Sequence, residues 1–389
     1  MAKIRHLAAF ALTVALLLPV LSLPITAVEA SAPQIYAGAA VLIEAESGNV
    51  ILSHNASSRL PMASTTKIMT ALVALETASP DTRITVDAAA VGAEGSSVYL
   101  CAGEELTLEQ LLYALLLESA NDAALAIAIG LCGTAEAFAD RMNQKAEALG
   151  LVDTHFVNPH GLDDEAHYTT AYELARLTQA ALQNELFAQI VSTRRSTIPH
   201  AGNTDGRLLI NHNKLLRTYP DCIGVKTGYT SRSGRCLVSA ATRGGVTLIA
   251  VSLNAAGDWQ LHSDMLDYGF TRYHAVLLAD ADTYRASLPV VGGVRESVTL
   301  TNETALSVTL PVGHGSIRTV VEAPRFLYAP TVAGDAVATA HFYCDTDGDG
   351  HEELIASIPL IVCESVELQP DKSPFAALWA WICGLFGRS

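Results

Sequence analysis

The sequence predicts an α/β domain with an antiparallel sheet, followed by a small all-β domain. Residues 39–52 have the pattern of a β-hairpin, and residues 236–242 and 246–253 have the pattern of consecutive antiparallel strands. Between them lies a long block of helical segments. After about Tyr273 the chain changes to alternating segments rich in valine and threonine, which are typical of strands. Helices inserted between parts of an antiparallel sheet indicate a layered α/β domain.

The composition is that of a folded, acidic protein. The 389 residues are 50% hydrophobic and 16% charged, and 24 Lys and Arg stand against 40 Asp and Glu, which gives a net charge of −16. A chain of this length is expected to form more than one domain. An acidic surface repels a phosphate backbone, so the charge argues against nucleic acid as a partner.

The N-terminus predicts export. Lys3 and Arg5 precede an apolar run over residues 7–23, and Ala30-Ser31-Ala32 supplies small residues for cleavage. This is the pattern of a secretory signal peptide over residues 1–32. An uncleaved membrane anchor is the alternative, and in either case the following domain works outside the cytoplasm, at the outer face of the cytoplasmic membrane or in the cell envelope.

The apolar run over residues 68–75 predicts a helix, and Ser64 and Lys67 stand at its start. Residues three apart share a helix face, so the Lys67 amine is expected to lie against the Ser64 hydroxyl. The helix start also directs unpaired backbone N–H groups at Ser64, which suits an oxyanion. S-x-x-K alone is a weak signal, because an N-cap serine and a solvated lysine give the same pattern.

Two apolar helices are predicted at 108–117 and 123–131, the first capped by Thr107 with Gln110 three residues later. The polar break between them contains Ser119 and Asn121. A polar break between two apolar helices is expected to face a ligand, although a solvated connecting loop is the alternative.

Further along, helices are predicted at 135–149 and 169–182, separated by a loop that contains His160. His160 is a candidate to line the site, although a loop histidine is more often structural. Lys226-Thr227-Gly228 follows and precedes the last two strands. The motif is therefore expected at the inner edge of the antiparallel sheet.

The sequence gives no support for a metal site or a cofactor. The segment 345–350 resembles the start of a calcium loop, but Ala356 stands where an EF-hand needs glutamate, so a hairpin turn is the better interpretation. The seven cysteines form no zinc-binding cluster. Cys222 with Cys236, and Cys344 with Cys363, could be bridged in an oxidising compartment, and free thiols are the alternative.

The last residues predict a membrane-binding tail. Within residues 371–389, the segment 375–386 is apolar on nearly every side, carries Trp379 and Trp381, and is flanked by Lys372 and Arg388. A helix of this length is too short to cross a hydrocarbon core of about 30 Å, so it is expected to lie in the membrane surface. Packing on the protein itself or on a partner is the alternative.

The order S-x-x-K, S-x-N, K-T-G is the signature of penicillin-binding proteins and class A β-lactamases. With the three motifs placed, the chain resembles the low-molecular-mass penicillin-binding proteins of the serine D-alanyl-D-alanine carboxypeptidase family. Four further segments carry the resemblance: residues 119–124, 158–162, 213–216 and 228–230. It implies a β-lactamase/transpeptidase-like catalytic domain at 33–275 and a small β-sandwich-like domain at 276–370.

The resemblance implies a serine carboxypeptidase that removes the terminal D-Ala from peptidoglycan stem pentapeptides and is covalently inhibited by β-lactams. Ser64 would form the acyl-enzyme, with Lys67 as its base and Ser119 as proton relay. The expected substrate-binding residues are Asn121, Lys226, Thr227, Gly228 and Tyr229, with the Ser64 and Tyr229 N–H groups as the oxyanion hole. The nearby Lys226 charge and partial desolvation are both expected to lower the pKa of Lys67, the charge more strongly.

The chain departs from the family in one respect. Members often carry an arginine near the start of the helix that follows the last strands, where it contacts the substrate carboxylate, and residues 244–271 contain none. Either Lys226 and Thr227 suffice, or Arg232 substitutes for it.

Two enzymatic alternatives stay open. A class A-like β-lactamase needs a glutamate that activates the deacylating water, and no Glu-x-x-x-Asn segment lies between Asn121 and Lys226. A DD-endopeptidase that cuts peptidoglycan crosslinks would use the same motifs. A scaffold with an inactive site is disfavoured, because every motif residue is present.

Overall fold

The structure is a computed structural model that describes residues 31–370. Most of the predicted signal peptide and the whole predicted membrane-binding tail lie outside these residues. Among the described residues no single helix is long and apolar enough to span a membrane, and one bent pair of helices, Asn121–Cys132 with Ala135–Ala148, passes that test together by length and composition.

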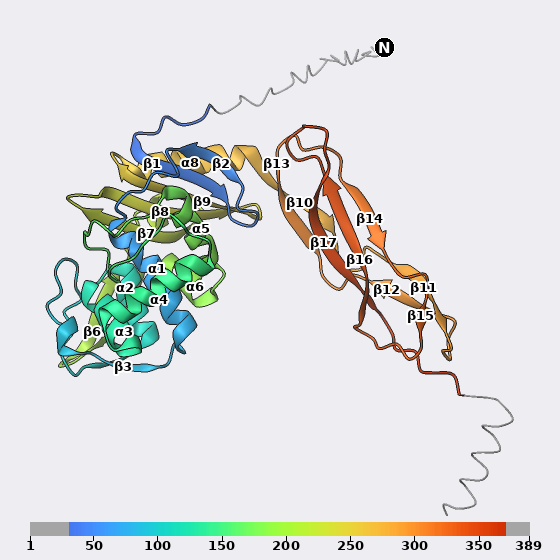
Figure 1. Cartoon of the computed structure of the whole chain (residues 1–389), viewed down its shortest axis with the longest axis horizontal. Coiled ribbons are helices and arrows are strands. Elements are labelled where there is room, and N and C mark those ends of the chain that lie inside the picture. Colours follow the sequence, from blue (N-terminus) through green and yellow to red (C-terminus); the bar gives the residue numbers. More distant parts are fainter. Residues whose placement is uncertain (1–30, 371–389) are drawn as a thin grey trace, which may run out of the picture. The chain divides into compact units, whose positions relative to one another are not determined.

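A five-stranded antiparallel sheet organises the first part of the chain (Figure 1). Its strand order is β2-β1-β9-β8-β7. The strands are β1 (Ala37–Glu44), β2 (Val50–His54), β7 (Cys222–Thr230), β8 (Gly234–Arg243) and β9 (Val246–Ala255). The two predicted hairpins are therefore confirmed, and the first and last strands of the domain lie side by side in the sheet. The strand that carries Lys226-Thr227-Gly228 is an edge strand.

Helices cover both faces of this sheet, which explains why β1 is almost continuously apolar. Val41 and Ile43 belong to the core shared with the inserted helices, whereas Ala40 and Leu42 pack in the core under α8 (Asp258–Arg272). The inserted helices are α1 (Lys67–Thr77), α2 (Leu108–Leu117), α3 (Asn121–Cys132), α4 (Ala135–Ala148), α5 (Ala171–Leu182) and α6 (Glu185–Ser192). A single further turn, α7 (Leu215–Thr218), precedes β7. This layering confirms the predicted α/β class.

The helix boundaries follow from local chemistry. Thr107 and Gln110 form a capping box at the start of α2, as predicted. Thr170 caps α5 by accepting from the Glu173 N–H. Ser64 lies one turn before α1, in the 3-10 helix η1 (Ala63–Thr66), so the predicted helix begins at Lys67 and not at the serine.

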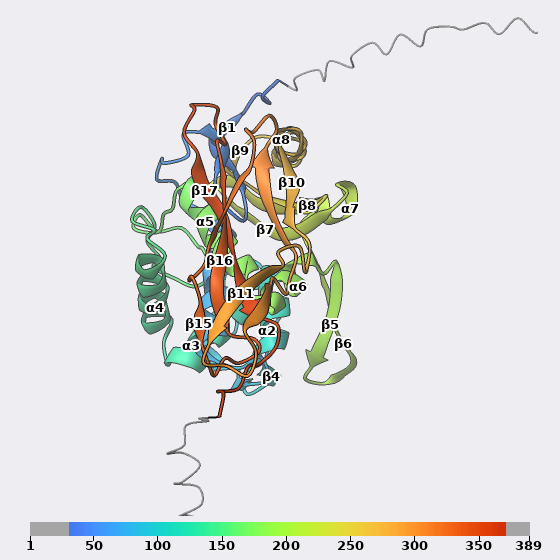
Figure 2. The same ribbon diagram turned by 90° about the vertical axis from the view of Figure 1, so that its right-hand side faces the viewer.

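The hairpin of β5 (Arg195–His200) and β6 (Asn203–Ile210) was not predicted from the sequence, and it projects as a two-stranded ribbon (Figure 2). The Arg207 guanidinium donates to both carboxylate oxygens of Glu104, at 2.6 and 2.8 Å, and to the Val98 and Tyr99 carbonyls. The Arg207 and Glu104 side chains are only 6% and 5% exposed. This buried ion pair joins the hairpin to the segment before α2, which contains η2 (Ala88–Ala90) and is flanked by β3 (Arg83–Thr85) and β4 (Glu105–Thr107).

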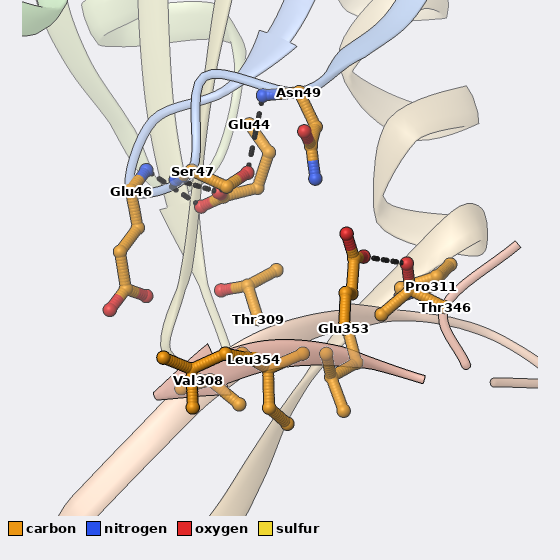
Figure 3. Close-up of a pocket in the computed structure, with 12 residues that line it drawn as sticks. Glu44, Glu46, Ser47, Asn49, Val308, Thr309, Pro311, Thr346, Glu353 and Leu354 are labelled. Carbon is orange, nitrogen blue, oxygen red and sulfur yellow. Dashed lines mark hydrogen bonds between the residues drawn. The ribbon is translucent and has the colours of Figure 1, made fainter. Parts of the chain in front are cut away.

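The β1–β2 turn is closed by a buried carboxylate (Figure 3). Glu44 accepts hydrogen bonds from the Glu46 and Ser47 backbone N–H groups and from the Ser47 hydroxyl. The Glu44 N–H donates to the Asn49 carbonyl. A charged acceptor that satisfies three donors explains why a glutamate is tolerated at the end of a core strand.

The chain after α8 is all β, as predicted. A two-stranded sheet pairs β10 (Tyr273–Ala279) with β13 (Leu306–Pro311), and a six-stranded sheet has the order β14-β16-β17-β12-β11-β15. The latter strands are β11 (Ala286–Val291), β12 (Ser297–Thr301), β14 (Arg318–Glu322), β15 (Leu327–Tyr328), β16 (Ala336–Cys344) and β17 (Glu353–Val362). The boundary placed at 275/276 falls inside β10 and stays a prediction.

The segment 345–350 lies in the turn that joins the antiparallel strands β16 and β17, as the hairpin interpretation predicts. Asp345 shapes this turn by accepting from the Gly348 and Gly350 N–H groups. The six cysteines among the described residues are free thiols, so neither candidate disulfide is formed.

The Arg207–Glu104 pair yields a stability prediction. Arg207→Leu should lower the free energy of unfolding by about 3–5 kcal/mol, because it leaves a buried carboxylate without its partner. Denaturant unfolding followed by circular dichroism measures this. Arg59→Leu is the matched control, since Arg59 forms an exposed ion pair with Asp153 and should change stability far less. Equal losses of unfolding free energy in Arg207→Leu and Arg59→Leu would contradict a stabilising role for the buried Arg207–Glu104 pair.

Candidate active site

The Lys67 amine is the centre of a buried hydrogen-bond cluster. Its Nζ lies 2.9 Å from Ser64 Oγ, 2.7 Å from Asn121 Oδ1 and 2.6 Å from the His160 carbonyl oxygen. Lys67 has no exposed surface. The predicted contact between the Lys67 amine and the Ser64 hydroxyl is therefore present, and the second motif contributes Asn121 to the same cluster.

The backbone just before Ser64 is held in an unusual conformation. Ala63 has φ 48°, a left-handed value that is rare for a residue with a side chain. Two glycines pack closely around it: a Cβ on Gly161 would lie 2.0 Å from the Ala63 carbonyl oxygen, and one on Gly228 would lie 3.0 Å from the Ser64 nitrogen. Gly161 must be glycine, because any side chain there would overlap the backbone of η1, and a Cβ on Gly228 would require neighbouring atoms to move by a few tenths of an ångström.

The break between α2 and α3 positions the second motif. Ser119 has φ 59° and is 5% exposed. Asn121 is the first residue of α3, and its Nδ2 donates to the Glu94 carbonyl. The sequence-predicted Ser119 and Asn121 thus come to the same place as Ser64, although Ser119 makes no hydrogen bond through its hydroxyl to another described residue.

The third motif lies along the edge strand β7. Lys226 is 2% exposed, and its Nζ donates to the Thr227 carbonyl at 3.0 Å. Thr227 and Gly228 face the cavity, and Tyr229, whose side chain is 67% exposed, lies at its rim.

A cavity of about 370 Å³ brings the motifs together with residues that sequence reasoning missed. The motif residues on its wall are Ser64, Ser119, Thr227, Gly228 and Tyr229; the additional ones are Ser96, His212, Lys214, Arg235, Cys236, Asp258 and Trp259. Arg232, the predicted substitute for the family arginine, does not line it. Hairpin register could have identified Arg235, because this residue pairs with Tyr229 across the turn from β7 to β8.

Comparison with known proteins assigns the family. The family model of peptidase family S11, described as D-alanyl-D-alanine carboxypeptidase, matches residues 26–257. The chain belongs to this family. The resemblance inferred from the sequence is thereby confirmed.

Individual family members match over most of their length. The chain is 32% identical to D-alanyl-D-alanine carboxypeptidase DacF of Bacillus subtilis (strain 168), over 85% of this chain and 86% of that protein. It is 32% identical to DacC of Escherichia coli (strain K12), over 90% of this chain and 88% of that protein. Its structure superimposes on penicillin binding protein 5 from Haemophilus influenzae with a TM-score of 0.65 and 27% identity, covering 86% of this chain and 98% of that one.

Burial controls the charge state of the lysine in this S11-family site. The pKa of Lys67 is well below the ordinary lysine value, first because the amine is desolvated and second because of the Lys226 charge, with Asp122 acting in the opposite direction. The expectation that the Lys226 charge is the stronger cause is therefore wrong. The sequence placed the two lysines in one site but could not show that no solvent reaches Lys67.

Neighbouring groups are also shifted by burial. Desolvation lowers the pKa of Lys226 to about 7, opposed by the charge of Glu118. Desolvation, with the Lys67 charge as second cause, lowers the pKa of His160 to about 3. The His160 ring accepts from the Leu162 N–H through Nδ1, whereas its backbone carbonyl accepts from Lys67. His160 therefore contributes its carbonyl to the S11-family site, and its neutral ring shapes the loop.

Among the described residues, one group of three acidic, histidine or cysteine side chains has the spacing to hold a metal ion. It comprises Asp345, Asp347 and Asp349, whose ligand atoms lie within 4.8 Å of one another. These residues lie in the β16–β17 turn and do not line the cavity with Ser64.

The ranking of the two causes for Lys67 can be tested. Lys226→Met removes a positive charge and should raise the pKa of Lys67, yet leave it clearly below the ordinary lysine value, because desolvation is the larger cause. The pH titration of the Lys67 Cε resonance measures it. Lys145→Met, which removes a lysine paired with Glu76, is the control and should leave the pKa of Lys67 unchanged. A return of Lys67 to the ordinary value in Lys226→Met would overturn the ranking.

Proposed function

We propose that the chain is a serine D-alanyl-D-alanine carboxypeptidase that acts on peptidoglycan stem peptides through an acyl-enzyme on Ser64. The observation that carries this proposal is the hydrogen-bond set of Lys67. A neutral amine has two N–H donors and one lone pair. The His160 carbonyl oxygen only accepts, and so does Asn121 Oδ1, so the lone pair is left for the Ser64 hydroxyl. That arrangement makes Lys67 a general base for Ser64.

In the acylation step, Ser64 Oγ attacks the carbonyl carbon between the two D-alanines while its proton passes to Lys67. The developing oxyanion accepts hydrogen bonds from the backbone N–H groups of Ser64 and Tyr229. The C–N bond then breaks, and the leaving amine of D-Ala takes a proton that Lys67 supplies through Ser119. The second product is an ester between the peptide and Ser64.

In the deacylation step, water replaces the leaving amine. Lys67, which is neutral again, accepts a proton from the water as it attacks the ester carbonyl, and the Ser64 oxygen leaves with that proton. No glutamate is among the described residues that line the cavity. A class A-like β-lactamase mechanism therefore lacks its glutamate base among these residues, and the one carboxylate on the wall, Asp258, lies 3.9 Å from the Arg235 guanidinium. Both observations favour the carboxypeptidase.

The partners and location of the chain are part of the proposal. β-Lactams would acylate Ser64 as covalent inhibitors, since their carbonyl occupies the place of the scissile peptide. The signal-peptide pattern in residues 1–32 supports export, and the apolar tail in residues 371–389 supports attachment to the outer face of the cytoplasmic membrane.

The nucleophile assignment is tested by incubating the full-length chain with a fluorescent penicillin and with diacetyl-Lys-D-Ala-D-Ala. We expect stable label on Ser64 by mass spectrometry and release of D-alanine; Ser64→Ala should lose both, whereas Ser58→Ala, at an exposed serine, should keep both. Label that persists in Ser64→Ala would refute the assignment. Rapid penicillin hydrolysis without stable label would indicate a β-lactamase, and label without D-alanine release would indicate an endopeptidase.

We further propose that Arg235 and Lys214 bind the C-terminal carboxylate of the substrate. A carboxypeptidase must recognise this charge, and these two cations line the cavity beside Thr227. Asp258 lies 3.9 Å from the Arg235 guanidinium, and Lys214 lies over the Trp259 ring at 5.9 Å. Both side chains are thus supported at the wall, which makes Arg235 a better substitute for the family arginine than Arg232.

Arg235→Ala should lower kcat/KM for diacetyl-Lys-D-Ala-D-Ala by about 10–100-fold, the loss of one charge-assisted hydrogen bond. Turnover of N-acetyl-D-alanine p-nitrophenyl ester, whose leaving group has no carboxylate, should change less than about twofold, because the Ser64 site is intact. Arg232→Ala is the matched control and should leave both rates unchanged. A large loss in Arg232→Ala, with none in Arg235→Ala, would reverse the assignment.

A further inference from the structure

A buried hydrogen-bonded chain runs from the loop before α5 to the residue that precedes Ser64. The Val157 N–H donates to His167 Nδ1 at 3.0 Å. His167 Nε2 lies 2.7 Å from Thr66 Oγ1, which donates to the Ala63 carbonyl oxygen at 2.8 Å. His167 is 3% exposed and Thr66 has no exposed surface, so water does not compete for these bonds.

The direction of every hydrogen bond in this chain is fixed. A backbone N–H can only donate, so Nδ1 of His167 must be the unprotonated nitrogen. A neutral imidazole then carries its proton on Nε2, which donates to the lone pair of Thr66 Oγ1. The Thr66 hydroxyl uses its own proton for the Ala63 carbonyl. His167 thus acts in one tautomer, and every donor has an acceptor.

The Ala63 carbonyl, where these hydrogen bonds end, is linked directly to the proposed oxyanion hole. The Ala63 C=O and the Ser64 N–H belong to one planar trans peptide unit and point in opposite directions. Fixing the carbonyl oxygen of Ala63 therefore fixes the direction of the Ser64 N–H. Ala63 is left-handed at φ 48°, a conformation that needs external support in a residue with a side chain.

The same loop holds the start of α1 at two more points. The Pro159 carbonyl accepts from the Thr70 hydroxyl at 2.6 Å, and the His160 carbonyl accepts from Lys67. These contacts place the loop firmly against α1. They do not touch the Ala63 carbonyl, which receives its hydrogen bond from Thr66.

We propose that His167, acting through Thr66, is a positioning residue that orients the Ser64 N–H for oxyanion binding. This inference rests on the proposed function, because it concerns residues that hold the Ser64 N–H in the proposed oxyanion hole. His167 touches neither Ser64 nor the cavity wall, so its effect is exerted through the Ala63–Ser64 peptide.

Acid should disrupt the hydrogen bonds that link Val157, His167 and Thr66. Protonation would place an N–H on Nδ1 opposite the Val157 N–H, so two donors would face each other. The groups that act on His167 are Asp164, which favours the charged form, and His155 and Lys67, which oppose it; the edge of the Phe156 ring completes the surroundings. Desolvation is the largest cause, and it lowers the pKa of His167 to about 4. The hydrogen bonds from Val157 through His167 and Thr66 are therefore intact at neutral pH and are lost as the pH falls through about 4.

The test measures kcat and KM of the full-length chain with N-acetyl-D-alanine p-nitrophenyl ester. Thr66→Val removes the hydroxyl with little change in shape and should lower kcat about 10-fold or more, while KM stays within about twofold, since a misdirected oxyanion donor affects the transition state. Thr66→Ser restores the hydroxyl and should recover most of kcat. His167→Phe should lower kcat to a similar extent, and the double variant should be no worse than either single one, because both act through one chain.

His262→Phe is the matched control. His262 is another buried neutral histidine, placed between the Ser239 and Ser252 hydroxyls on the face of the sheet under α8. Its loss should lower the melting temperature without lowering kcat per folded molecule. Equal losses of kcat in His262→Phe and His167→Phe, additive losses in the double variant, or an unchanged kcat in folded Thr66→Val would each overturn the inference.

Different results would contradict the proposed function and the positioning role of His167. If Ser64→Ala still hydrolyses the ester, the proposed function is wrong. If Ser64→Ala is inactive and Thr66→Val is fully active, the proposed function stands and the positioning role of His167 is wrong.

Discussion

The buried Lys67 amine is the interaction on which the rest of the site depends. It joins three segments that are far apart in sequence, because its partners come from η1, from the start of α3 and from the loop at His160. A buried amine without such partners would be strongly destabilising. The same burial lowers its pKa, so one structural condition supplies both the cohesion of the site and the neutral base that the proposed chemistry needs.

Much of the fold could be predicted from the sequence, since it is encoded in local patterns. The helix at Leu108–Leu117 has its predicted bounds because Thr107 and Gln110 form a capping box. The hairpin of β5 and β6 escaped detection because its strands contain Pro199 and Gly206 and show little alternation. Its attachment depends on Arg207 and Glu104, which are 103 residues apart in sequence, and a local pattern carries no information on such a pair.

The site was predictable to the extent that its chemistry resides in motifs. Ser64, Lys67 and Asn121 meet as the motif order implied, but the degree of burial that ranks the causes of the Lys67 pKa shift is a property of the packed domain. Arg235, the proposed carboxylate-binding residue, belongs to no motif and does not lie at the helix start where family members carry their arginine. Strand register, rather than a motif, places Arg235 opposite Tyr229.

Two residues with side chains adopt left-handed conformations in the site, Ala63 and Ser119. Each such residue costs about 1–3 kcal/mol, and glycine would remove that strain. Glycine would also free the backbone to leave the conformation, whereas an alanine wedged between Gly161 and Gly228 and hydrogen-bonded to Thr66 has one arrangement that fits. The strain at Ala63 is thus offset by close packing on both sides. In the proposed mechanism, that close packing, together with the Thr66 hydrogen bond, holds the Ser64 N–H in a single direction before any substrate arrives.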